Sequence, residues 1–76
     1  MEIKEFIENF AELFDDTDAS VIRPDTKFKD LDEWSSLIAL SLISMADEVY
    51  DVTLVADDIR ESETVEDLFN RVETKA

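Results

Sequence analysis

The stretch that decides the fold is SLIALSLISMADEVY, residues 36–50. No charged side chain occurs in residues 37–46, although carboxylates crowd the rest of the chain. Apolar residues recur here at the spacing of three and four that is typical of one helix face, namely Leu37, Leu40, Ile43, Ala46 (or Met45) and Tyr50. The pattern predicts a helix over residues 36–50 that buries this face.

The outer face of the same helix follows from its geometry. If Leu37, Leu40 and Ile43 point inward, the helical period places a second set of side chains toward the outer side: Ile38, Ser41, Leu42 and Met45. We therefore expect this helix to present a partly apolar surface.

Two adjacent serines mark the start of this helix. Ser35 is the candidate N-cap, because its hydroxyl can accept a hydrogen bond from an unpaired amide of the first turn. The unpaired amides and the positive end of the helix dipole also favour a phosphate attached here, which gives Ser36 a second possible role. Because a serine at a helix start is usually only a cap, the local pattern leaves both roles open.

Three further helices are expected around residues 36–50. Residues 2–14 place apolar side chains on one face and acids on the other, and residues 56–60 allow one helical turn. The last helix begins at Thr64, where Thr64 and Asp67 resemble a capping box with aspartate in the glutamate position. Its buried stripe is predicted to contain Val65, Leu68, Phe69 and Val72.

Residues 21–35 form a long connection that contains no glycine. Packing must therefore order it, and its apolar anchors are Val21, Ile22, Phe28, Leu31 and Trp34. No run alternates as a strand does. The predicted fold is all-α, a small bundle of three main helices plus one short helix, in a single domain over residues 1–76.

Composition excludes most chemistry. The 76 residues include no cysteine, histidine or glycine, so a thiolate nucleophile, the commonest general base and transition-metal ligand, and glycine-rich phosphate-binding loops are all missing. The adjacent acids Asp57 and Asp58 fit a solvated face or a first helical turn better than a catalytic pair. Asp16 and Asp18 have calcium-loop spacing, but Val21 occupies the position where that loop requires glycine. We expect neither an enzyme nor a metal site.

Charge limits the partners. Twenty-one acids and seven bases give a formal net charge of −14, which repels nucleic acid and anionic membranes and attracts basic protein surfaces. The apolar stretches are too short to span a membrane, and no signal segment opens the chain. We expect a cytoplasmic monomer.

Several short runs, in this order, resemble the acyl carrier proteins: PDTKFKDL at 24–31, Ser36-Leu37, DEVYD at 47–51, DDI at 57–59 and TVEDL at 64–68. The resemblance spans residues 3–72 and implies the fold of that family. It also implies that Ser36, the serine before leucine, carries 4′-phosphopantetheine, which a phosphopantetheinyl transferase attaches from coenzyme A. The chain would then hold acyl or aminoacyl groups as thioesters and deliver them to other enzymes without catalysing a reaction itself.

The chain departs from the family pattern at two positions. Asp32 stands where a glycine is usual, Ser35 stands where an aspartate is usual, and the spacing from Leu31 to Ser36 is one residue longer. Ser35 is therefore a rival attachment site, although the following Leu37 favours Ser36.

The partner surface implied by the resemblance surrounds this serine and follows the helix: Trp34, Ser35, Leu37, Ile38, Ser41, Leu42, Met45, Asp47 and Glu48. General fatty-acid carriers commonly expose acids at the second and fifth positions after the serine, where this chain has Ile38 and Ser41. Acyl-transferring and chain-elongating partners should therefore make more apolar contacts here.

Three functions remain open. The first is a general fatty-acid carrier, and the second is a carrier dedicated to polyketide, aminoacyl or cell-envelope synthesis. The third, from another class, is an unmodified acidic interaction module or inhibitor.

Overall fold

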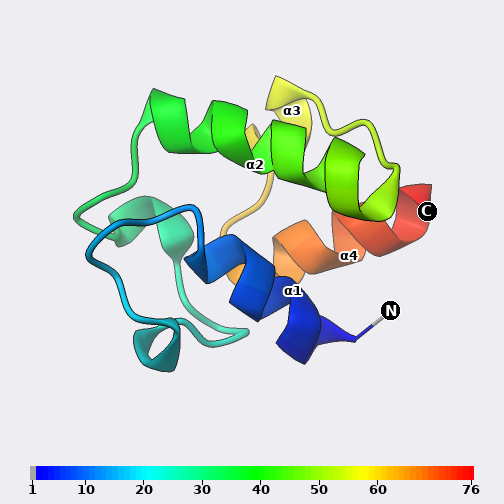
Figure 1. Cartoon of the computed structure of the whole chain (residues 1–76). Helices are drawn as coiled ribbons and strands as arrows, with labels where there is room; N and C mark the ends of the chain where they lie inside the picture. The colour runs from blue at the N-terminus through cyan, green and yellow to red at the C-terminus, as the bar shows by residue number, and fades with distance from the viewer. Residues whose placement is uncertain (1) are drawn as a thin grey trace.

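The computed structural model describes residues 2–76 and is all-α, with no strand in that range (Figure 1). Its helices are α1 (Ile3–Ala11), α2 (Ser36–Tyr50), α3 (Ala56–Arg60) and α4 (Val65–Lys75). Two 3-10 turns, η1 (Ala19–Val21) and η2 (Phe28–Asp30), lie in the long connection. The predicted bundle of three main helices plus one short helix is confirmed. In Figure 1, α2 runs across the top of the molecule with α1 and α4 below it.

Local signals set the helix ends. In the capping box of α4, the Thr64 hydroxyl accepts from the Asp67 amide at 3.2 Å, and the Asp67 carboxylate accepts from the Thr64 amide at 3.1 Å. α2 ends at Tyr50, and its C-cap residue Asp51 adopts a left-handed conformation with φ of 56° in a chain without glycine. The Val52 amide then bonds to the Ala46 carbonyl at 3.1 Å, so the chain reverses into the core.

The first helix is shorter than predicted. The apolar pattern extends to Phe14, but α1 ends at Ala11, and the amides of Leu13 and Phe14 bond three residues back to Phe10 and Ala11. This tighter turn still buries Phe14, so the packing is retained although the helix is not.

Aromatic rings from distant segments make up much of the core. Phe6 of α1 meets Phe69 of α4 with ring centroids 5.7 Å apart, and Phe10 meets Phe28 of η2 at 6.3 Å. Of the predicted loop anchors, Ile22 and Phe28 are buried, and Leu31 and Trp34 pack half-buried against the core. Val21 is 56% exposed, so its prediction as an anchor is wrong: in this short turn the neighbouring Ile22 takes the inward position.

The predicted inward face of α2 is right at Ala46, and Ile43 and Tyr50 pack half-buried against the core, but it is wrong at Leu37 and Leu40. Leu37 and Leu40 are 71% and 62% exposed, whereas Leu42 is fully buried and Met45 and Ala46 are buried beside it. Residues 37–46 are so uniformly apolar that two stripes share the helical period, and tertiary packing selects the one through Leu42.

Within residues 2–76, no helix combines the length and the apolar character needed to cross a membrane.

Candidate functional site

The two serines at the start of α2 have different surroundings. Ser35 is the N-cap, as predicted: its backbone is extended, and its hydroxyl accepts from the Ile38 amide at 3.3 Å. Ser36 is the first residue of the helix, is exposed, and makes no side-chain hydrogen bond within the described residues. The first turn of α2 contains no acid, so its positive dipole end is not neutralised there. The free hydroxyl is therefore that of Ser36.

Two contacts fix the segment that leads into α2. The Trp34 ring packs edge-on against Phe28 with centroids 4.8 Å apart. The Glu33 carboxylate accepts from the amides of Asp15 and Asp16 at 3.2 and 3.0 Å and from the Thr17 hydroxyl. The Thr17 hydrogen bond is the main reason why the pKa of Glu33 lies below its ordinary value. Trp34 and Glu33 therefore anchor the two residues directly before the serines, and the Trp34 ring remains half-buried.

Ser36 borders an apolar groove between α2 and α3. The groove has a volume of about 320 Å³ and is lined by Ser36, Ala39, Leu40, Ile43, Ala56 and Ile59. Ser36 is the only polar residue in this lining. A lining of this kind is suited to an aliphatic group.

A buried carboxylate holds the α3 wall of this groove in place. Asp58 is 5% exposed, and it accepts from the Val55 amide at 3.0 Å, from Lys75 at 2.5 Å and from Arg71 at 3.1 Å. Lys75 and Arg71 both come from α4. The Lys75 hydrogen bond is the main reason why the pKa of Asp58 lies below its ordinary value, and the hydrogen bond from the Val55 amide is the second. Burial acts in the opposite direction and raises this pKa.

Sequence reasoning missed the role of Asp58. Asp57 and Asp58 do form the first turn of α3, and Asp57 fits the expected solvated position, paired with Arg60 on the surface. Asp58 instead locks α3 onto α4. The available signal was the spacing of Arg71 and Lys75, four residues apart on α4, which places two cations on one face.

The structure separates the predicted partner residues into three groups. Leu37, Asp47 and Glu48 are exposed, like the two serines. Ile38 and Ser41 are half-buried, as is Trp34. Leu42 is fully buried and Met45 is 8% exposed, so the prediction that they face outward is wrong, because they belong to the stripe that packs on the core. Leu40, which sequence reasoning placed inward, is exposed, whereas Leu42 and Met45 are buried.

Residues 2–76 bring together no group of three acidic side chains that could hold a metal ion. Asp18 accepts from the Ser20 amide at 3.1 Å and so caps η1.

Comparison with family models, curated proteins and solved structures found no match to this chain.

Proposed function

We propose that the protein is a carrier of acyl groups, with 4′-phosphopantetheine attached to the Ser36 hydroxyl. The observation that carries this proposal is the position of Ser36, an exposed hydroxyl without a partner at the start of a long helix and at the border of an apolar groove. The sequence resemblance to acyl carrier proteins supports it independently.

The surroundings of Ser36 fit the attached group. A phosphodiester on the Ser36 oxygen places a negative charge beside unpaired amides and the positive end of α2, where the first turn contributes no competing acid. Ser35 already uses its hydroxyl to cap the helix, which leaves Ser36 for modification. The bound arm supplies the thiol that this cysteine-free chain lacks.

The groove between α2 and α3 favours an aliphatic cargo. Its walls, Ala39, Leu40, Ile43, Ala56 and Ile59, offer no charged group to an aminoacyl amine. Each methylene that the groove removes from water contributes about 0.8 kcal/mol. Acyl chains are therefore preferred over aminoacyl groups.

The partners are a phosphopantetheinyl transferase and enzymes that load, extend or receive the acyl chain. Beside Ser36 they meet Leu37 and Leu40, which are exposed and apolar. Such a surface suits a dedicated set of partners better than the enzymes of general fatty-acid synthesis, which commonly read acids at this helix. We propose that the carrier acts as a monomer in the cytoplasm.

Attachment is tested by incubating the purified protein with coenzyme A and a broad-specificity transferase, followed by intact-mass measurement. We expect one added arm on the wild type and on Ser35→Ala, and none on Ser36→Ala. The paired serine variants control for each other, because each removes one hydroxyl from the same turn. An arm that persists in Ser36→Ala and disappears in Ser35→Ala would move the site to Ser35, and an unmodified wild type would favour the interaction module.

A further inference from the structure

The chain that leads into Ser36 is held at three consecutive residues. The Glu33 carboxylate accepts hydrogen bonds from the segment that follows α1. The Trp34 ring lies edge-on against the buried ring of Phe28, with centroids 4.8 Å apart. The Ser35 hydroxyl caps α2. Ser36 comes next, and within residues 2–76 its side chain is the first in this run that makes no such contact.

Glu33 uses both oxygens of its carboxylate. Oε1 accepts from the Asp16 amide at 3.0 Å and from the Thr17 hydroxyl. Oε2 accepts from the Asp15 and Asp16 amides at 3.2 and 3.1 Å. We call this set of hydrogen bonds the Glu33 clamp. It joins positions that lie 16 to 18 residues apart in the sequence, and its bonds are strengthened by the charge of the acceptor.

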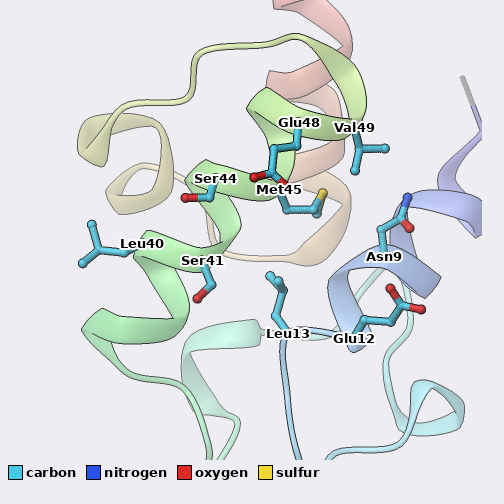
Figure 2. Close-up of a pocket in the computed structure, with 9 residues that line it drawn as sticks. All are labelled: Asn9, Glu12, Leu13, Leu40, Ser41, Ser44, Met45, Glu48 and Val49. Carbon is cyan, nitrogen blue, oxygen red and sulfur yellow. The ribbon is translucent and has the colours of Figure 1, made fainter.

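The segment that the clamp holds is itself fixed to the core. Phe14 is buried, and its ring meets that of Phe10 with centroids 5.2 Å apart. Leu13 packs half-buried against the core and points between α1 and α2 on the side of Met45 (Figure 2). Residues 15–17 follow directly. The clamp therefore ties the entry to α2 to a part of the protein that is already packed.

The position of the clamp gives it a local effect. Its bonds to the Asp15 and Asp16 amides are exposed. Because water replaces such bonds when they open, their loss costs the whole fold little unfolding free energy. Glu33 is only three residues before Ser36, however, so its bonds restrict the direction in which the chain enters α2. Loss of the clamp should loosen the Ser36 backbone more than it destabilises the protein.

We propose that Glu33 is a positioning residue for the modification of Ser36, because the clamp sets the orientation in which the phosphopantetheinyl transferase receives the Ser36 hydroxyl. This role rests on the carrier function proposed above. In the attachment step, the Ser36 oxygen bonds to the phosphorus of coenzyme A that bears the pantetheine. The bond from this phosphorus to the oxygen that bridges the two phosphates breaks, and the nucleotide leaves with the serine proton.

This chemistry depends on direction. The attacking and leaving oxygens lie roughly in line at the phosphorus, so the rate depends on where the Ser36 oxygen points. Direct contact of the Glu33 carboxylate with the transferase is a different role, and the clamp argues against it because both oxygens are already occupied by donors of the same chain. Glu33→Gln removes the charge and the clamp together. Thr17→Val removes one donor of the clamp and leaves the carboxylate in place.

The test measures kcat and KM of a broad-specificity transferase for the apo protein at saturating coenzyme A. We expect Glu33→Gln to lower kcat about tenfold and to leave KM within about twofold of the wild-type value, because docking is retained and only alignment is lost. Thr17→Val should lower kcat about threefold with the charge intact. The double variant should be no slower than Glu33→Gln alone, since both changes act through one set of bonds.

Asp32→Asn is the matched control, because it removes the same charge from the exposed neighbour of Glu33. Its kcat should equal that of the wild type. NMR order parameters give a readout that needs no transferase: those of residues 33–36 should fall in Glu33→Gln and Thr17→Val and stay unchanged in Asp32→Asn. Circular dichroism verifies that each variant is folded at the assay temperature.

The outcomes separate this role from the carrier function. A wild-type kcat in Glu33→Gln, or equal slowing by Asp32→Asn, would overturn the positioning role and leave the carrier function in place. An effect of Glu33→Gln that Thr17→Val does not share would also overturn it, because the transferase would then contact the carboxylate directly. A wild type that accepts no arm would reject the carrier function and, with it, this role of Glu33.

Discussion

Replacing Asp58 by asparagine tests how α3 is held against the rest of the bundle. The change keeps the size of the side chain but removes the charge that Lys75 and Arg71 share. Breaking a fully buried ion pair by removing one partner costs about 3–5 kcal/mol. Here the side chains of Lys75 and Arg71 are 34% and 40% exposed, so both cations regain water when Asp58 is neutral. We therefore expect a smaller loss of unfolding free energy, about 2 kcal/mol, which corresponds to about 10 °C in Tm for a domain of this size.

The pH dependence of that loss identifies its cause. Because the folded-state pKa of Asp58 lies below the ordinary value of 3.8, its ionised form stabilises the fold at every pH above that value. The contribution disappears as the pH falls through the lower folded-state pKa, since the carboxyl is then protonated in both states. Urea denaturation followed by circular dichroism should show the full difference between wild type and Asp58→Asn at pH 7 and a shrinking difference below about pH 4.

Asp57→Asn is the internal control for this experiment. Asp57 is adjacent in sequence, but its ion pair with Arg60 is exposed, so its loss should change the unfolding free energy by no more than about 0.5 kcal/mol. Equal effects of the two variants, or an Asp58→Asn difference that is the same at pH 7 and at acid pH, would refute the assignment of Asp58 as the α3–α4 lock.

Three other outcomes are expected in denaturation experiments. Ser35→Ala should lower the unfolding free energy by about 1 kcal/mol through loss of the α2 cap, and Ser36→Ala should leave it nearly unchanged; similar losses would contradict the division of roles. Leu42→Ala should cost about 3 kcal/mol, whereas Leu37→Ala should cost less than about 0.5 kcal/mol, and the reverse order would restore the orientation that periodicity predicted for α2. Added salt or millimolar divalent cations should raise Tm, because a net charge of −14 repels itself; an insensitive Tm would mean that the charges are already compensated.

The bounds of α2 and α3 and the start of α4 were predictable because local signals determine them, whereas the end of α1 was not. Ser35, Thr64 and Asp67 cap their helices with atoms three residues away, and the bounds of α2 and α3 agree with the residues expected from spacing. The orientation of α2 was not predictable, since two apolar stripes fit the same period and only contact with the rest of the core distinguishes Leu42 from Leu40.

The candidate site was predictable only in part, for the same reason. Ser36 was singled out because its place before Leu37 at the start of a predicted helix is visible in the sequence itself. Asp58 bonds to Arg71 and Lys75, which lie 13 and 17 positions further along the chain. The groove beside Ser36 is lined by residues of both α2 and α3, which come together only in the folded protein. Neither relation leaves a local pattern in the chain, so both required the folded structure.

The placement of the cations connects stability with recognition. The ion pairs of Arg60, Arg71 and Lys75 are with the acids of α3 and with Glu61, which follows it. The acids of α1 and those at the end of α2 remain exposed. Their mutual repulsion opposes folding, and these same unpaired acids are the ones that would attract a basic protein surface.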